Sequence, residues 1–126
     1  MARRLPPRPT DAEVAILNVL WDLGPSTVRE VHEDLSRWKD SGYTTTLKFL
    51  QIMTEKGLVL RDESERAHVY RIAVSEARTL RQLTRDLMER AFGGSAEKLV
   101  MHALQAKKVS EEDLARIREL LDGFGD

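Results

Sequence analysis

Apolar residues recur at helical spacing through the first part of the chain. In residues 11–23 they fall on one face of a helix, and Thr10 followed by Glu13 has the spacing of a capping box. The glycine and proline at 24–25 stop that helix, and a second capping box opens another helix at residues 27–36. The pattern predicts two short helices joined by a turn.

Residues 43–57 carry a third helical pattern, and its outer face is polar. Thr46, Leu50 and Met53 share one face, and Gly57 suits the left-handed conformation that ends many helices. The opposite face carries Thr45, Lys48, Gln51, Ile52 and Glu55. Such a segment is either a recognition helix or an ordinary solvated surface helix, and taken alone it favours the second.

The period changes from helical to alternating after residue 57. Residues 58–61 and 66–73 have the pattern of two short strands, with a turn at 62–65 between them. A hairpin is not stable alone in water, so it must pack on the preceding helices. Three helices followed by a hairpin is the order of a winged helix-turn-helix, in which the third helix enters the major groove. The predicted fold is mainly α with a small β-hairpin, although winged helices also serve as protein-binding modules.

From residue 75 the chain is helical again, in three amphipathic segments too short to form a stable domain alone. Their apolar stripes contain Leu80, Leu83, Leu87, Leu99, Leu104, Leu114, Ile117, Leu120 and Leu121. The economical partner for these stripes is a second copy of the chain across a two-fold interface. The alternative is an extended monomer in which the helices fold back on the winged helix. The expected organisation is a flexible basic arm at 1–9, a winged-helix DNA-binding domain at 10–74 and a helical dimerisation region at 75–126.

The arm at 1–9 contains Arg3, Arg4 and Arg8 among prolines. It is either a disordered terminus, which is the more common case, or a basic arm that lies along phosphates or a minor groove.

Charge and composition restrict the possible functions. The net charge is −1, and residues 1–74 hold equal numbers of basic and acidic residues. A DNA-binding face must therefore be built by clustering basic residues locally, and its non-specific affinity for DNA should be modest and salt-sensitive. The chain of 126 residues has no cysteine, which excludes disulfides, thiolate catalysis and cysteine-bound metals. It also lacks a long apolar run and a signal-peptide core, so we expect a cytoplasmic protein.

No motif for catalysis, a cofactor or a metal is present. His32, His68 and His102 lie far apart, and none stands in a metal-protease spacing. We therefore expect a protein that is not an enzyme and needs no cofactor. A labile site of histidine with aspartate or glutamate across a dimer interface is the one metal site that a single sequence leaves open.

With these elements placed, the chain resembles the penicillinase-repressor family of bacterial transcriptional regulators (the BlaI/MecI/CopY group). The resemblance runs from about Pro9 to Leu121. It rests on AEVAILNVLWDLGPSTVREVHEDL, on GYTTTLKFLQIMTEKGLVLRD, on RAHVYRIA, and on the stretch from EKLVMHAL to SEEDLARIRELLD. It implies an N-terminal winged helix, a C-terminal dimerisation region, and repression by a homodimer on an inverted-repeat operator.

The resemblance also implies site residues. It places DNA contacts at Thr44, Thr45 and Lys48, with Tyr43 near the helix start, and the position of Thr44 and Thr45 in the first helical turn agrees. We add Gln51 from the same outer face. The wing could reach phosphate through the side chains of Arg61, Arg66 and His68. The start of the second helix could donate backbone N–H groups to phosphate at Ser26 and Thr27.

Three departures from the family pattern affect function. Ile52 stands where many relatives have an arginine, which puts the operator sequence in doubt. The cysteine cluster of the copper-responsive branch is absent, so copper sensing by thiolates is excluded. In the antibiotic-responsive branch a membrane sensor-protease inactivates the repressor by cleavage near an Asn-Phe bond, and the matching position here is His102-Ala103.

A winged-helix protein-interaction adaptor that does not bind DNA is the alternative function, and the near-neutral charge of residues 1–74 favours it.

Overall fold

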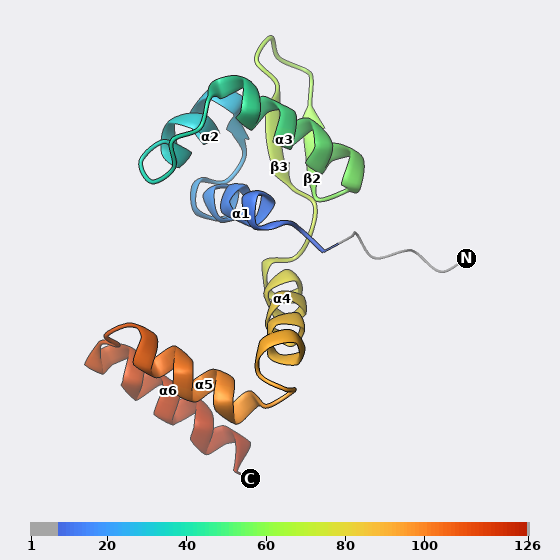
Figure 1. The fold of residues 1–126 in the computed structure, drawn as a ribbon. Helices are drawn as coiled ribbons and strands as arrows, with labels where there is room; N and C mark the ends of the chain where they lie inside the picture. Colours follow the sequence, from blue (N-terminus) through green and yellow to red (C-terminus); the bar gives the residue numbers. More distant parts are fainter. Residues whose placement is uncertain (1–7, 126) are drawn as a thin grey trace. The chain divides into compact units, whose positions relative to one another are not determined.

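The computed structural model describes residues 8–125, as helices and three short strands (Figure 1). In chain order the elements are α1 (Asp11–Leu23), β1 (Ser26–Thr27), α2 (Val28–Leu35), α3 (Tyr43–Lys56), β2 (Val59–Asp62), β3 (Val69–Ile72), α4 (Glu76–Ala91), α5 (Ala96–Ala106) and α6 (Glu111–Phe124). The predicted fold class, mainly α with a small β-hairpin, is confirmed. The basic arm falls largely outside the described residues; of its arginines, Arg8 is described and exposed.

The described chain divides into two units, one ending at Leu83 and the other beginning at Thr84. The division falls inside α4, whereas the sequence placed a boundary at residue 74. The first turns of α4 belong with the first unit and include the buried Thr79. The separate domains at 10–74 and 75–126 stay a prediction.

Capping boxes start the first two helices as predicted. At α1 the N–H of Thr10 donates to Glu13 Oε1 at 2.9 Å, and the N–H of Glu13 donates to Thr10 Oγ1 at 3.2 Å. Thr27 and Glu30 repeat both bonds at α2. Gly57 ends α3 with φ 81°, a left-handed conformation that a side chain would strain.

The sheet has three strands in the order β1-β3-β2, so the predicted two-stranded hairpin was incomplete. The missed strand lies in the turn between α1 and α2, where Ser26 pairs with Tyr70 and Thr27 with Val69. Two residues are too few to show an alternating pattern, and their pairing is with a distant part of the chain. The first hairpin strand has its predicted length, shifted by one residue, but the second is shorter than predicted, which lengthens the connecting loop to residues 63–68.

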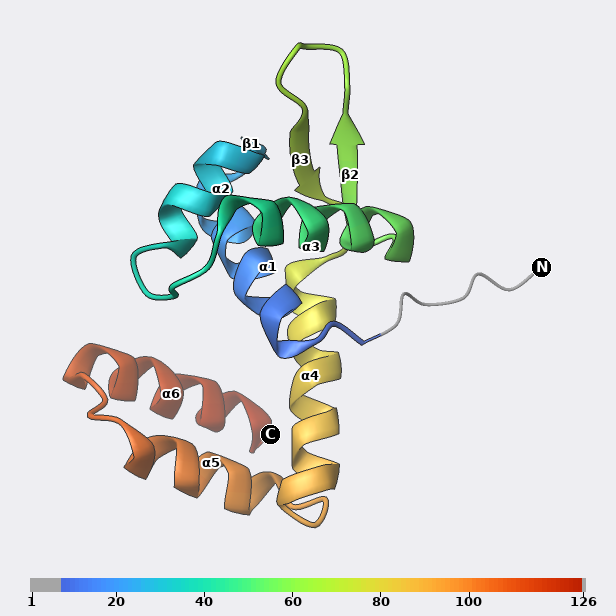
Figure 2. The same ribbon diagram turned by 45° about the horizontal axis from the view of Figure 1, so that its top comes forward.

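One core holds the three helices and the sheet together. Leu17, Val31, Leu50 and Val59 are fully buried in it, and each comes from a different element. Tyr70 of β3 is also buried, at 1% exposure, and it packs the wing onto the helices. Figures 1 and 2 show α3 and the β2–β3 hairpin on the same side of this unit, with α1 below α3 in both views.

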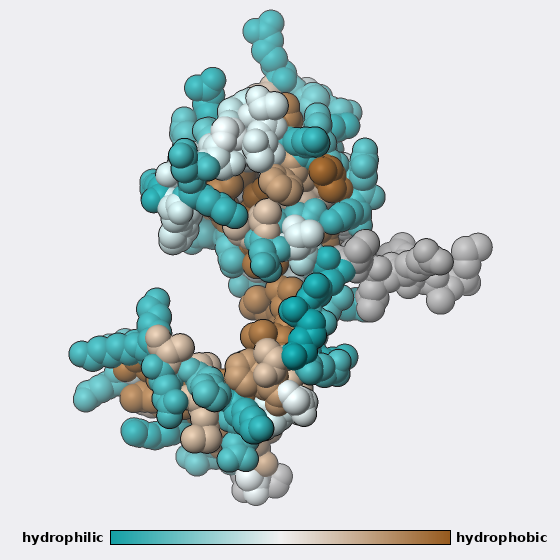
Figure 3. Space-filling view, in the orientation of Figure 1, coloured by the Kyte–Doolittle hydropathy of each residue, from teal (hydrophilic) through white to brown (hydrophobic). Residues whose placement is uncertain are grey.

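The second unit consists of well-capped helices without a buried core. Ser95 caps α5 and Ser110 caps α6, while Gly93 and Gly94 take positive φ in the turn after α4. Among the described residues from 84 onward, none is buried. Apolar side chains remain on the surface of this unit, as the brown areas of Figure 3 show. No described helix of either unit has both the length and the apolar character needed to cross a membrane.

Candidate nucleic-acid interface

The outer face of α3 presents the polar residues that the sequence singled out. Thr44, Thr45, Lys48 and Gln51 are all exposed, and they occupy neighbouring turns of one face. The inner face is fully buried at Thr46, Leu50 and Met53. The core therefore fixes the rotation of α3 about its axis, and that rotation points the threonines and the lysine outward.

The N-terminus of α3 differs from those of the helices before it. Gly42 is its N-cap, and this residue makes no side-chain capping hydrogen bond, whereas α1 and α2 both begin with capping boxes. The first N–H groups of a helix have no partner within the helix, and the helix dipole makes this end positive. The start of α3 therefore offers backbone donors beside the exposed Thr44 and Thr45.

His32 supports this end of α3 from α2, a role that the sequence did not indicate. Its Nδ1 lies 3.4 Å from Oγ1 of the buried Thr46, and its ring meets the ring of Tyr43 edge-on at a centroid distance of 5.8 Å. The hydroxyl of Ser36 lies 3.5 Å from the other ring nitrogen. Tyr43, predicted as a DNA contact, is 46% exposed and so keeps a free side while it contacts His32.

A buried ion pair anchors the other end of α3 to α1. Lys56 Nζ donates to both carboxylate oxygens of Glu13 at 2.9 Å, and Glu13 is 1% exposed. Burial alone would raise the pKa of Glu13, but the Thr10 N–H and the Lys56 ammonium together lower it below its ordinary value. The sequence indicated Glu13 as a capping residue alone, because a contact between residues so far apart leaves no local pattern.

The wing brings two of its predicted DNA contacts to a single carboxylate. Arg61 Nη2 lies 3.1 Å from Glu63 Oε1, and His68 Nδ1 lies 4.0 Å from the same atom. Arg66 is exposed in the connecting loop. The hairpin projects past α3 in Figure 2, and Arg61 on β2 and His68 in the connecting loop are both exposed.

The start of α2 uses some of its polar groups within the protein. Ser26 is 2% exposed, and its hydroxyl donates to the carbonyl of Gly24 at 2.8 Å. The N–H of Thr27 is already bonded to Glu30 in the capping box. The Ser26 hydroxyl and the Thr27 N–H are therefore bonded within the protein, while donation to phosphate from this helix start stays a prediction.

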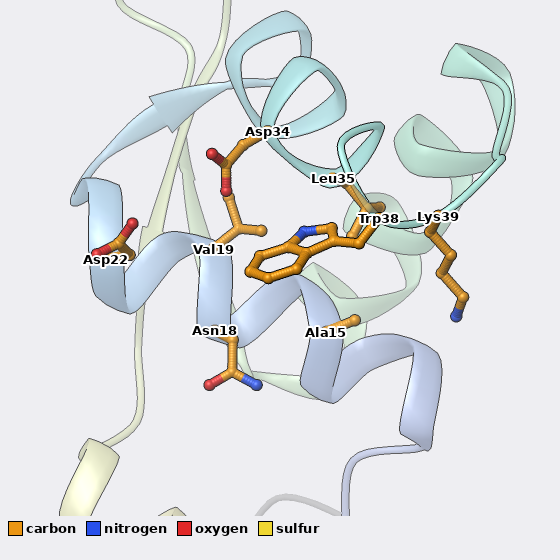
Figure 4. A pocket seen from close by; sticks show the side chains of 8 residues that line it. All are labelled: Ala15, Asn18, Val19, Asp22, Asp34, Leu35, Trp38 and Lys39. Carbon is orange, nitrogen blue, oxygen red and sulfur yellow. The ribbon is translucent and has the colours of Figure 1, made fainter. Parts of the chain in front are cut away.

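A groove lies on the first unit between α1 and the segment that follows α2 (Figure 4). Its lining comprises Ala15, Asn18, Val19, Asp22, Asp34, Leu35, Trp38 and Lys39. Trp38 lies across α1 there and is nevertheless 78% exposed. Elsewhere, no group of three or more potential metal ligands occurs within residues 8–125.

Most of the predicted dimerisation residues keep apolar surface in this chain. Leu87, Leu104, Leu120 and Leu121 are exposed, from 37% at Leu104 to 62% at Leu120. Leu80 is exposed in the first unit, while the remaining predicted positions are half-buried: Leu83, Leu99, Leu114 and Ile117.

The predicted proteolytic position, His102-Ala103, lies exposed on α5, where the His102 ring contacts that of Phe92 at a centroid distance of 5.8 Å.

A polar third helix, anchored at both ends and followed by a projecting hairpin, defines a winged-helix protein. The chain belongs to the penicillinase-repressor family, because the sequence model described as penicillinase repressor matches residues 9–123. This confirms the family predicted from the sequence. The family consists of transcriptional repressors rather than enzymes, as the sequence also led us to expect.

Two relatives match almost the whole chain. The transcriptional regulator BlaI of Mycobacterium tuberculosis is 34% identical over 119 residues, which cover 91% of this chain and 86% of that protein. The penicillinase repressor of Bacillus licheniformis is 22% identical, over 92% of this chain and 91% of its own length.

Two solved structures share the fold of the first unit. The solution structure of the DNA-binding domain of the repressor BlaI has a TM-score of 0.53 and 24% identity, over 60% of this chain and 92% of that one. The Bacillus licheniformis BlaI monomeric form in complex with the blaP half-operator has a TM-score of 0.52 and covers the same shares.

Proposed function

We propose that this protein is a sequence-specific repressor that binds double-stranded operator DNA as a homodimer. The observation that carries the proposal is the exposed face of Thr44, Thr45 and Lys48 at the uncapped start of α3, with the wing on the same side of the unit. The complex of the Bacillus licheniformis relative with a half-operator supports it, because that protein shares the fold of this unit.

The outer face of α3 has the chemistry to read base edges. Threonine can donate or accept a hydrogen bond and can also contact the methyl group of thymine, while glutamine can pair with adenine at two positions. Lys48 can reach a guanine edge or a phosphate. Ile52 is half-buried on the same helix and offers apolar contact where many relatives have an arginine. Operator preference should therefore depend on Thr44, Thr45, Lys48 and Ile52.

Dimerisation is proposed to pair the second units of two chains. Exposed leucines on α4, α5 and α6 support it, because two-fold contact would remove that apolar surface from water. Two winged helices related by a two-fold axis would occupy two half-sites. We expect an inverted-repeat operator with half-site centres about one helical turn apart or a multiple of it.

Lys48→Ala tests the recognition helix. If Lys48 contacts a base, the substitution should cost about 1–3 kcal/mol of binding free energy and relax one operator position. If Lys48 contacts phosphate, the affinity for all DNA sequences should weaken alike, and the dependence of that affinity on salt should decrease. DNA selection with the wild-type chain, followed by titration of the selected duplex, measures both outcomes.

Lys107→Ala is the matched control, because it removes the same charge from an exposed position in the second unit. Equal losses for both variants would contradict a direct role of Lys48. Selection that enriches no inverted repeat would refute the operator proposal as a whole.

We further propose that the repressor is cytoplasmic. Its induction would follow from cleavage by a membrane sensor-protease, which would release it from the operator. The His102-Ala103 bond is exposed but lies inside α5, so cleavage would require local unfolding of that helix. A neighbouring gene for a membrane protein with a zinc-protease motif would support this mechanism. Without such a gene another signal must release the repressor.

The second candidate function is a protein-interaction adaptor. The groove beside the exposed Trp38 and the near-neutral charge of the first unit favour it. An adaptor should have no affinity for duplex DNA at low salt, whereas the repressor should bind there and weaken as salt rises.

A further inference from the structure

One acidic residue of the wing lies against an arginine and a histidine that would face DNA. The carboxylate oxygen Oε1 of Glu63 is 3.1 Å from Arg61 Nη2 and 4.0 Å from His68 Nδ1. The side chains of Arg61, His68 and Glu63 are 34%, 44% and 56% exposed, so all three remain open to solvent.

The backbone of the loop holds Glu63 in this position. Asp62 ends β2 and accepts the N–H of Ser64 at 2.9 Å, which closes a tight turn around Glu63. That hydrogen bond also lowers the pKa of Asp62 below its ordinary value. Arg61 and His68 stand on either side of the turn, and Glu63 therefore lies between them.

We propose that Glu63 occupies the place of a DNA phosphate in the free protein and limits the affinity of the wing for DNA. The inference rests on the proposed function, since it assumes that the wing meets a duplex. A carboxylate and a phosphate both accept hydrogen bonds from guanidinium. Arg61 must then exchange Glu63 for a phosphate on binding, and the displaced carboxylate is left close to the negative backbone.

The consequence is a wing that contributes little net charge to binding. While Arg61 is paired, the two charges cancel, and little counterion release is gained at that position. Removing the carboxylate should tighten binding about two- to fivefold, the range expected for an exposed ion pair. It should also steepen the dependence of log affinity on log salt by about 0.9, the value for one additional neutralised phosphate.

Glu63→Gln tests this, with Glu65→Gln as its matched control. Glu65 lies in the same loop and forms no ion pair with any residue between 8 and 125, so the control removes one negative charge without freeing a cation. The probe is a mixed-sequence DNA duplex titrated at several salt concentrations, because phosphate contacts do not depend on sequence. We expect Glu63→Gln to bind more tightly than Glu65→Gln and with the steeper salt dependence.

A double-mutant cycle then assigns the effect to Arg61. In an Arg61→Ala background, Glu63→Gln should lose most of its advantage over Glu65→Gln, because the cation that it frees is absent. Equal affinities for Glu63→Gln and Glu65→Gln in the wild-type background would overturn the inference while leaving the proposed function intact. Failure of the wild-type chain to bind any duplex at low salt would refute the proposed function instead.

Discussion

The two units of this chain use the same local signals but differ in how much they bury. α1 in the first unit and α6 in the second both begin with a side-chain cap on an N–H group of the first turn. The helices of the first unit then surround fully buried residues such as Leu17 and Leu50, whereas no described residue from 84 onward is buried. The helices α5 and α6 of the second unit are therefore capped by single serine hydrogen bonds, but they lack the buried packing of the first unit.

This difference separates what forms a helix from what stabilises a fold. Caps and spacing determine where a helix begins and which face is apolar, but isolated helices of this length are marginal in water. Most of the stability of short helices comes from burial of their apolar face. The first unit buries that face within one chain, while the second leaves much of it exposed.

Leu50→Ala and Leu120→Ala should give the largest contrast between the units. Leu50 is fully buried on α3, so its truncation should lower the free energy of unfolding by about 2–5 kcal/mol through lost burial and a cavity. Leu120 is 62% exposed, and at low protein concentration its truncation should change that free energy by less than about 0.5 kcal/mol.

Urea denaturation followed by tryptophan fluorescence measures the first effect, because Trp21 and Trp38 both lie in the first unit. Far-UV circular dichroism at the same low concentration follows the helices of the second unit. A cost for Leu120→Ala as large as that for Leu50→Ala would mean that the second unit has a core of its own.

Sequence reasoning succeeded where the determining interactions are local. The bounds of α1, both capping boxes and the left-handed Gly57 follow from residues within a few positions of each other. The missed features are all long-range. β1 pairs with β3 across the chain, and Lys56 reaches Glu13 across the core.

The candidate interface shows the same limit. The outer face of α3 follows from helical spacing, and Thr44, Thr45 and Lys48 are exposed as that spacing requires. The N–H of Thr27 is bonded within its capping box, and Ser26 pairs with Tyr70 in a strand that the sequence did not reveal. The support that His32 gives to the start of α3 was also missed, since it depends on how α2 packs against α3.

Leu121→Asp tests whether a second chain covers the apolar face of the second unit. Leu121 is 57% exposed on α6, so an aspartate there should not disturb the folded monomer. Burying that charge in a dimer interface should cost about 2 kcal/mol or more and weaken self-association by at least about 30-fold. Sedimentation of the intact chain over a range of concentrations measures the change.

Leu23→Asp is the control, because Leu23 is a similarly exposed leucine, at 47%, in the first unit. It should leave self-association unchanged. A wild-type chain that stays monomeric at all concentrations would show that the second unit needs no copy of itself.

The smallest expected effect is the pH dependence that Glu13 adds to the first unit. Its pKa in the folded chain lies below the ordinary value of 4.5, so its ionised form stabilises the fold. This contribution is fully present above about pH 4.5 and is lost as the pH falls through the folded pKa, because the unfolded chain takes up its proton first. Glu13→Gln should therefore be less stable than the wild type at neutral pH, and this difference in the free energy of unfolding should decrease on acidification.

Urea denaturation at neutral pH and near pH 3, followed by tryptophan fluorescence, measures the difference. Other carboxylates titrate in both proteins and cancel in the comparison. A difference that stays constant with pH would mean that Glu13 acts through packing rather than through its charge, and the first unit would then hold α1 and α3 together by burial alone.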